Sequence, residues 1–311
     1  MKRAAWIDLA LMALILGALI LLFGSLSSHF LSARTFSTVA NRIPTLAVVA
    51  AGMTLVLMVR GIDLSVGSVM ALSGAVCGAL VASSHWPFWA AAAVAILTGA
   101  AVGAFNGGIS VCLRVPSFIV TLGTLEAARG LAYLVTNSQT QYLGESVAAL
   151  SAPLWAAGLS LAFLIALVVI AKGQVILSHA AAGRHLIAVG SNEEAAHLSG
   201  IRSDWLKFWV FTASGALAGL GAVFYVSRLG AADPNAGSGL ELSAIAAAVI
   251  GGTSLAGGRG SMVRTFFGVL IIATLEAGLA QVGVSEPLKR VITGTVIILA
   301  VITDALRTRR A

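Results

Sequence analysis

The chain has 311 residues, of which 59% are hydrophobic and only 10% are charged, and its mean hydropathy is +0.98. Soluble domains carry about 25% charged residues, so this composition excludes a soluble globular protein and indicates an integral membrane protein. The 19 basic residues outnumber the 12 acidic ones. No basic groove interleaved with aromatic residues accompanies this excess, so we expect no nucleic-acid partner.

Uncharged stretches of 18 or more residues, such as 9–28 and 90–113, predict helical spans. Helical spans need about 20 apolar residues, whereas barrel strands need about 10 with strict alternation. We predict an all-α, polytopic helical membrane protein with about ten transmembrane helices, some short or broken, in a single transmembrane domain over 1–311. Polar, glycine, proline and charged clusters separate the expected spans, which are 6–28, 43–59, 66–84, 88–111, 118–135, 153–171, 207–228, 241–255, 264–283 and 288–306.

The basic residues predict the orientation of these spans. With ten crossings and the N-terminus inside, 13 of the 19 Lys and Arg residues fall on the inner side, and the outer connection 136–153 has none. This bias predicts that both termini are cytoplasmic. The first span follows Lys2 and Arg3 as a secretory signal would, but its apolar run is longer than the apolar core of a signal, so we expect it to be retained.

Asp63 and Ser65 precede the third span, in the stretch GIDLS. They can cap the helix that follows. Alternatively, GIDLS is a break between helices whose exposed helix end faces a path across the membrane. Both interpretations can hold together, because non-helical backbone at membrane depth either lines a cavity or is buried in protein.

Further polar side chains lie in the fourth and fifth spans. Asn106 stands in the small-residue run GAFNGG, which suits either a helix-contact face or an amide that lines a path. The hydroxyls of Ser117, Thr121 and Thr124, at the start of the fifth span, either bond back to their own helix or line the same path.

Two glutamates lie inside spans, where charge is costly. Glu126 is three residues before Arg129 on one helical face, so the two either neutralise each other as an ion pair or line the path. Glu276 has no partner nearby in the sequence, and we expect a functional role for it. The candidate path residues are therefore Asp63, Ser65, Asn106, Ser117, Thr121, Thr124, Glu126 and Glu276.

Catalytic and metal sites are not indicated. No GK[ST] follows a glycine-rich loop, Ser254 is not in a G-x-S-x-G elbow, and no span pairs a serine with a histidine. His197 is three residues after Glu194, but no further metal ligands converge on them. We expect neither an enzymatic activity nor a metal ion on this chain.

The longest inner connection, 172–207, contains an expected short helix. Ser191 or Asn192 can cap it, acidic residues occupy its first turn, and Gly200 ends it. A helix of this length is unstable alone, so it either rests on its own bundle or docks into a cytoplasmic protein. Docking is the favoured alternative, and the residues that would dock are Asn192, Glu193, Glu194, Ala195, Ala196 and Gly200.

The stretch ELSAIAAAVIGGTSLAGGRGS (241–261) has a glycine-rich turn after an apolar run. In a soluble protein this pattern suggests a phosphate-binding loop, but the lysine and the strand–helix context are missing. Its apolar part of about 15 residues is short for a span. We therefore expect a half-helix or a steeply packed helix, and a crossing rather than a re-entrant segment, with the glycines turning the chain at the cytoplasmic edge.

Several of these stretches resemble the permease subunits of ABC importers. Glu194, Ala195 and Ala196, followed by Gly200, are similar to the EAA…G signature, the loop that sits in a cleft of the cytoplasmic ATPase. Four stretches, within residues 36 to 304, resemble in their order and spacing those of the ribose/xylose/arabinose-type permeases, which import monosaccharides. The stretches are GIDLSVGSVMALSG (61–74), PSFIVTLGT (116–124), AVGSNEEAAHLSGI (188–201) and the one at 241–261.

The resemblance implies a bacterial inner-membrane permease subunit with no cofactor of its own. Two copies, or this chain and a paralogous permease, would form a path for a monosaccharide or small polyol, lined by neutral hydroxyls and amides. An extracytoplasmic sugar-binding protein would deliver the solute, and a cytoplasmic ABC ATPase pair, holding ATP and Mg, would grip 191–201. The alternative is an ion-coupled secondary carrier for a small neutral solute, with Glu126 or Glu276 as coupling carboxylate.

Three positions depart from the pattern of that family. Arg60 stands where a glycine usually precedes GIDLS, Arg264 stands near a usual small residue, and Glu276 stands near a usual asparagine. The two arginines lie at the expected cytoplasmic edge, where charge is tolerated. Glu276 lies inside a span and bears on the identity of the solute.

Overall fold

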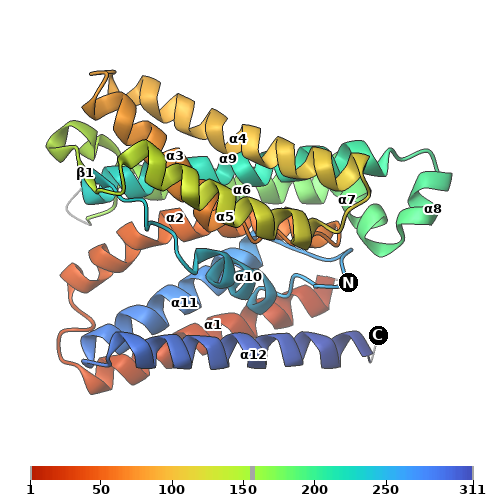
Figure 1. Ribbon diagram of the computed structural model, residues 1–311. Helices are drawn as coiled ribbons and strands as arrows, with labels where there is room; N and C mark the ends of the chain where they lie inside the picture. Colours follow the sequence, from red (N-terminus) through yellow and green to blue (C-terminus); the bar gives the residue numbers. More distant parts are fainter. Residues whose placement is uncertain (1, 155–157, 310–311) are drawn as a thin grey trace.

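Figure 1 shows the computed structural model, which describes the backbone of residues 2–154 and 158–309. The described chain is helical apart from its loops and a two-stranded antiparallel sheet of β1 (Gln141–Tyr142) and β2 (Ala231–Ala232). The helices are α1 (Lys2–Leu26), α2 (Ala33–Met58), α3 (Val66–Ala82), α4 (Phe88–Cys112), α5 (Ser117–Thr136), the 3₁₀ helix η1 (Gly144–Leu150), α6 (Leu161–His179), α7 (Ala181–Ser191), α8 (Glu193–Leu198), α9 (Ser203–Leu229), α10 (Leu240–Ile250), α11 (Met262–Gln281) and α12 (Glu286–Arg309). The side chains of the terminal basic residues lie outside the described part, namely those of Lys2, Arg3, Arg307, Arg309 and Arg310.

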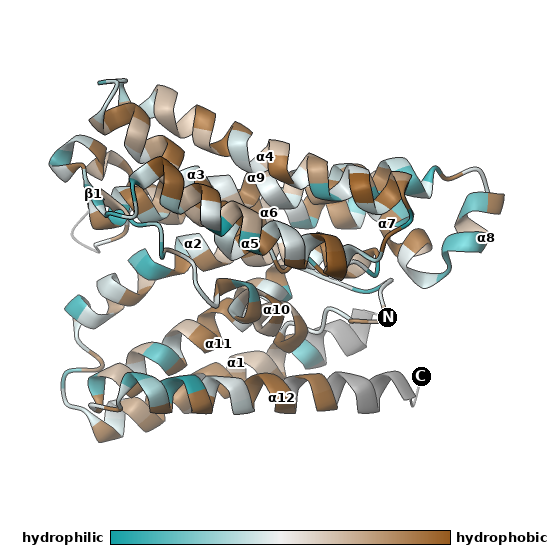
Figure 2. Cartoon of the chain, viewed as in Figure 1, coloured by the Kyte–Doolittle hydropathy of each residue, from teal (hydrophilic) through white to brown (hydrophobic). Residues whose placement is uncertain are grey.

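A helix occupies each of the ten expected spans, which confirms the polytopic helical fold. Seven helices of the described chain are long and apolar enough to cross a membrane: α1, α2, α4, α5, α6, α9 and α11. Hydrophobic residues occupy most of the length of these helices, and hydrophilic residues are frequent in loops, on α8 and at the start of α12 (Figure 2). The largest boundary differences are at α2, which begins at Ala33 rather than 43, and at α6, which begins at Leu161 rather than 153. Residues 155–157 lie outside the described part.

The two shorter apolar helices, α3 and α10, are each preceded by non-helical chain that completes a passage through the molecule. α3 starts after the unwound residues 61–65 and ends beside β2, where Gly78 lies against Ala232. α10 follows a turn after β2, and the loop after α10 reaches the end of α2, where Gly258 N donates to Met58 O (2.9 Å). The chain from β2 to this loop therefore runs from one end of the molecule to the other, as the expected crossing requires.

Close glycine contacts fix the packing of α4 on α9. A Cβ on Gly99 would overlap the carbonyl oxygen of Gly215, and a Cβ on Gly103 would overlap that of Phe211. Small residues spaced four apart let two helices approach closely in a membrane. The run GAFNGG is therefore a helix-contact face, and Gly107, four residues further on, continues it against Phe208.

The connection 172–207 differs from its prediction. The sequence predicts one short helix between loops, but α6 extends to His179, α7 precedes the short helix, and α9 already begins at Ser203. The signal for α7 is the spacing of Gly183, Leu186 and Val189, three residues apart, which form its buried face. Figure 1 places α7 and α8 at the same end of the molecule as the start of α1 and the end of α12, with β1 at the opposite end.

Candidate functional site

The unwound residues 61–65 lie between α2 and α3, and Asp63 and Ser65 are fully buried there. Asp63 Oδ1 accepts hydrogen bonds from Ser65 N (3.0 Å) and Ser65 Oγ (2.6 Å), and Asp63 Oδ2 accepts from Ser214 Oγ (3.3 Å) on α9. Ser65 occupies the N-cap position of α3, but its side chain makes no capping bond. The residues GIDLS therefore form a break that is buried in protein, and no side chain of the described residues caps α3. That the break faces a path across the membrane stays a prediction.

Hydroxyl groups of α5 satisfy the backbone of this break. Ser117 Oγ accepts from Ile62 N (3.0 Å), while Thr121 Oγ1 accepts from Leu64 N (3.1 Å) and donates to Ile62 O (3.2 Å). An unwound backbone inside a membrane bundle needs such partners because little water is present to replace them. These two hydroxyls therefore bond mainly across to the break and hold α5 against it.

Asn106 joins the break to α4 and α5. Its Nδ2 donates to Ser65 Oγ (3.0 Å), and its Oδ1 accepts from Thr124 Oγ1 (2.6 Å). The amide is fully buried, so both of its ends are satisfied by side chains. Six of the eight predicted path residues thus form one connected group, which we name the break cluster: Asp63, Ser65, Asn106, Ser117, Thr121 and Thr124.

Glu126 and Arg129 do not form an ion pair with each other, which is one of the two alternatives for them. Glu126 is exposed on α5. Arg129 Nη1 instead donates to the carbonyl oxygens of Pro234 (2.6 Å) and Ala236 (2.8 Å), in the turn between β2 and α10. The guanidinium carries several N–H donors on a long side chain, so it reaches these backbone carbonyls. A carboxylate has no donor for them. Arg129 therefore fixes the turn from which α10 starts.

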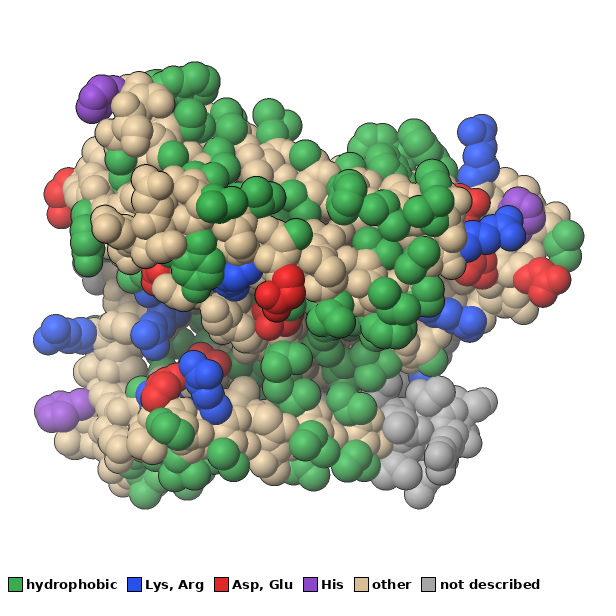
Figure 3. Space-filling model, in the orientation of Figure 1, with side chains coloured by type: hydrophobic (Ala, Val, Ile, Leu, Met, Phe, Trp, Pro, Cys, Tyr) green, Lys and Arg blue, Asp and Glu red, His purple; other side chains and the backbone are tan. Residues whose placement is uncertain are grey.

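A cavity of about 670 Å³ lies among α2, α9, α10, α11 and α12. Figure 3 shows acidic and basic groups around a hollow between the upper and lower helices. Glu276 is the only one of the eight predicted path residues on the described lining of this cavity. The sequence leads us to expect a solute path lined by neutral hydroxyls and amides, whereas six charged side chains line this cavity: Arg42, Arg228, Glu276, Glu286, Lys289 and Arg290.

Four of these charged groups form no ion pair in the described part of the chain, namely Arg42, Arg228, Glu276 and Arg290. The Arg228 guanidinium lies 5.4 Å from the centre of the Tyr225 ring, and its buried Nε has no hydrogen-bond partner there. Glu276 faces the cavity, whereas Glu286 pairs with Lys289 (2.9 Å). Unpaired charge within a membrane protein is costly and marks solute pathways. This cavity is therefore the candidate path. The sequence gives no signal for Arg228 as a lining residue, because Arg228 falls at the expected outer edge of a span.

The short helix expected near the end of the connection 172–207 is α8. Asn192 is its N-cap, and Asn192 Oδ1 accepts a hydrogen bond from Ala195 N (3.0 Å). Gly200 follows the helix with a φ of +85°, a conformation that favours glycine. Both ends of α8 thus form as the sequence predicts.

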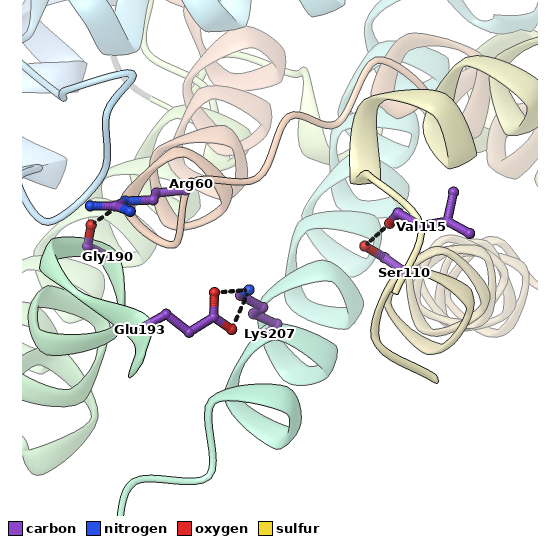
Figure 4. Close-up of polar contacts among 6 residues, drawn as sticks. All are labelled: Arg60, Ser110, Val115, Gly190, Glu193 and Lys207. Carbon is purple, nitrogen blue, oxygen red and sulfur yellow. Dashed lines mark hydrogen bonds and ion pairs between the residues drawn. The ribbon is translucent and has the colours of Figure 1, made fainter. Parts of the chain in front are cut away.

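One face of α8 packs on the bundle, and the other face is open. Both carboxylate oxygens of Glu193 accept hydrogen bonds from Lys207 Nζ on α9 (2.5 and 2.6 Å; Figure 4). Ala196 is buried, whereas Glu194 is exposed and Leu198 is 82% exposed. The structure therefore shows the support of this helix on its own bundle, and its docking into a partner stays a prediction.

A second cavity, of about 480 Å³, separates α8 from the break cluster. Glu193 and Lys207 line it from the side of α8 and α9, and Ser117 lines it from the side of α5. Its wall also carries Asp204 of α9 and two arginines that follow helices, Arg60 after α2 and Arg114 after α4. Sequence reasoning assigned no role to either arginine.

Comparison with known proteins decides the family. Residues 35–301 match the family described as branched-chain amino acid transport system / permease component. The chain belongs to this permease family. Ribose import permease protein RbsC of Escherichia coli (strain K12) is 38% identical over 313 residues, which cover 96% of this permease and 94% of the relative. No solved structure matches this permease.

Two further relatives show the range of solutes named in this family. D-allose transport system permease protein AlsC of Escherichia coli (strain K12) is 36% identical and covers 94% of this permease and 90% of its own length. Autoinducer 2 import system permease protein LsrC of Photorhabdus laumondii is 32% identical and covers 92% of this permease and 87% of its own length. The matched region 35–301 includes the break cluster, both cavities and α8. This permease is therefore a multi-pass membrane transport subunit.

Proposed function

We propose that this permease is the transmembrane subunit of a binding-protein-dependent ABC importer for a monosaccharide or a similar small polyol. The main support is the similarity to permeases named for ribose and D-allose, which extends over 96% and 94% of the chain. ATP would be hydrolysed, with Mg²⁺, on a separate cytoplasmic ABC ATPase. An extracytoplasmic sugar-binding protein would deliver the solute, and a second copy or a paralogous permease would complete the path.

In this assembly α8 docks into the ATPase. Its open face carries Glu194 and Leu198, and its ends are fixed by Asn192 and Gly200. Docking puts the α8 end of the molecule, and both termini with it, in the cytoplasm of a bacterial cell. The same orientation follows from the excess of basic residues on that side.

The larger cavity is the proposed solute path. It extends from Glu286 and Lys289, at the start of α12, to Met70 and Leu240, near the starts of α3 and α10. A solute that enters from the outer side would therefore reach the middle of the bundle. Carboxylates accept hydrogen bonds from sugar hydroxyls and guanidinium groups donate to them, and such charge-assisted bonds are strong. A charged wall is thus compatible with a neutral solute.

Uptake of radiolabelled ribose into proteoliposomes that contain the permease, the ATPase and the binding protein tests this function. We expect ATP-dependent uptake by the wild-type complex. Glu194→Lys reverses a charge on the docking face, and Gly200→Pro cannot adopt the φ of +85°, so both variants should insert normally but lose uptake. Glu194→Asp is the control, because it keeps an exposed carboxylate at the same position of α8 and should retain uptake.

Two results would contradict the proposed function. Uptake by the permease alone, driven by an ion gradient, would identify a secondary carrier, and neutralising Glu126 or Glu276 should then abolish it. Competition by leucine as effective as competition by unlabelled ribose would contradict the sugar assignment. Leucine is the relevant competitor because the description of the matching family names branched-chain amino acids.

A further inference from the structure

Arg60 ends α2 in a backbone conformation that favours glycine. Its φ is +61°, in the left-handed region, and its N donates to Leu57 O (3.0 Å). A long side chain in this conformation is strained, and such strain persists where the surroundings hold the residue in place. The next residue begins the break 61–65. Arg60 therefore stands where α2 passes into the break cluster.

The guanidinium of Arg60 joins two other elements to this point. Its Nε donates to Gly190 O (2.7 Å) and Ala256 O (2.9 Å), and its Nη2 donates to Ser191 O (2.6 Å). Figure 4 shows Arg60 reaching Gly190 from the end of α2. Gly190 and Ser191 are the last residues of α7, where carbonyls lack helix partners and the helix dipole is negative. Arg60 thus caps α7 and ties it to the loop after α10.

Backbone contacts make the same junction tight. Gly258 N donates to Met58 O (2.9 Å). A Cβ on Gly190 would overlap both Met58 O and Gly258 N, so α7 lies directly on these backbone atoms. The end of α2, the end of α7 and the loop after α10 form one unit.

We propose that Arg60 is a positioning residue that transmits displacement of α8 to the break 61–65, a role that rests on the function proposed above. α8 follows α7 after the single residue Asn192, so a pull on α8 acts on the two carbonyls of α7 that Arg60 holds. Since Arg60 directly precedes the break, the same pull reaches the backbone of the break. Docking and opening of the broken helix are coupled through this side chain.

The substitution Arg60→Gly separates this role from a structural one. Glycine adopts a φ of +61° without strain, so the end of α2 is kept while three hydrogen bonds are lost. Arg114→Gly is the matched control. Arg114 follows α4 with a φ of +54° and, like Arg60, is exposed and lines the second cavity. Its side chain makes no hydrogen bond or ion pair within the described chain. Both variants remove one positive charge and one strained residue, but only the first disrupts the junction.

The decisive measurement is ribose uptake per ATP hydrolysed, in proteoliposomes with the complete complex. We expect Arg60→Gly to retain ATPase activity but to lower this ratio about fivefold or more, and Arg114→Gly to keep the wild-type ratio. Arg60→Lys should be intermediate, because one ammonium cannot span three carbonyls as the guanidinium does. Equal ratios for the two glycine variants would overturn the role of Arg60. A wild-type complex without ATP-dependent uptake would instead refute the proposed function.

A distance measurement tests the junction even if transport fails. Spin labels at Leu97→Cys on α4 and Leu198→Cys on α8, in a cysteine-free background, report the position of α8, and both leucines are exposed (66% and 82%). We expect Arg60→Gly to broaden the distance distribution and Arg114→Gly to leave it unchanged. A wild-type distribution in Arg60→Gly would show that Arg60 does not hold α8, and would overturn the proposal.

Discussion

Asp63 gives the sharpest test of how the broken helix is held. The side chain accepts three hydrogen bonds, from Ser65 N, Ser65 Oγ and Ser214 Oγ, and it is 1% exposed. Asp63→Ala removes all three acceptor contacts, whereas Asp63→Asn keeps the shape and one carbonyl oxygen. If the carboxylate acts through its hydrogen bonds, the two variants should differ strongly. If it acts through its charge, they should fail alike.

The size of the difference follows from the partners that each variant leaves. In Asp63→Ala the buried Ser65 N loses its acceptor, at a cost of about 1–3 kcal/mol, and the net contribution of the remaining bonds adds about 1 kcal/mol. Ser214 Oγ can turn to a carbonyl of its own helix, so we take about 2–4 kcal/mol as the total. In Asp63→Asn the amide oxygen still accepts from Ser65, and the amide nitrogen donates to Ser214 Oγ. We expect a loss below about 1 kcal/mol there, partly offset because no buried charge remains.

Thermal unfolding in detergent and ribose uptake in proteoliposomes together decide between the two roles. Asp63→Ala should melt several degrees below the wild type, and Asp63→Asn should melt close to it and keep ATP-driven uptake. Ser214→Ala, which removes only the longest of the three bonds, is the control and should behave like Asp63→Asn. An Asp63→Asn protein that melts like the wild type but transports nothing would refute this reasoning. The charge of Asp63 would then act in transport itself.

Two further substitutions test contacts that join distant parts of the chain. Gly190→Ala should destabilise the permease by about 1–3 kcal/mol, because the added methyl group overlaps backbone atoms. Gly123→Ala is the control, at a helix position with nothing within 4 Å of the added Cβ, and it should be neutral or stabilising by up to about 1 kcal/mol. Equal melting midpoints for Gly190→Ala and Gly123→Ala would contradict the overlap at Gly190. Arg129→Ala should speed amide hydrogen exchange in 232–240, because two carbonyl contacts are lost, and Arg129→Lys should have a smaller effect. Unchanged exchange in Arg129→Ala would show that the turn before α10 is held by other contacts.

The helices and the break are predictable from the sequence because their signals are local. Hydropathy places a helix in every expected span, and the polar stretch GIDLS marks the break before α3. The sequence also identifies the residues of the break cluster, since polar groups deep in a membrane protein need partners. Their partnership is not predictable, because Asn106 bonds Ser65 across 41 positions and Ser214 bonds Asp63 across 151. The role of most of them as path-lining groups stays a prediction.

The charged cavity and the junction at Arg60 are beyond the reach of sequence patterns for a different reason. Arg42 and Arg228 lie at expected outer edges of spans, where an arginine needs no explanation. Only the packing of α2 against α9 and α11 turns them towards the cavity that also contains Glu276. Arg60 likewise looks like a charge at the membrane edge until its contacts with Gly190 and Ser191 are seen.

The glycine-rich loop after α10 shows which parts of the molecule can move together. A Cβ on Gly257 would overlap Arg60 and Gly190, and one on Gly258 would overlap Ser191; both glycines have positive φ, +83° and +75°. These glycines therefore allow close contact between the loop, α2 and α7, and a bulkier residue would force the three apart.

Elements in such close contact are displaced as one body. Movement must then be absorbed where the chain is not helical, which is at the break before α3 and at the turn before α10. α3 and α10 both start in the interior of the bundle, next to the larger cavity. In the proposed importer, a displacement of α8 would therefore change the shape of the cavity at its inner end, where the proposed path has to open.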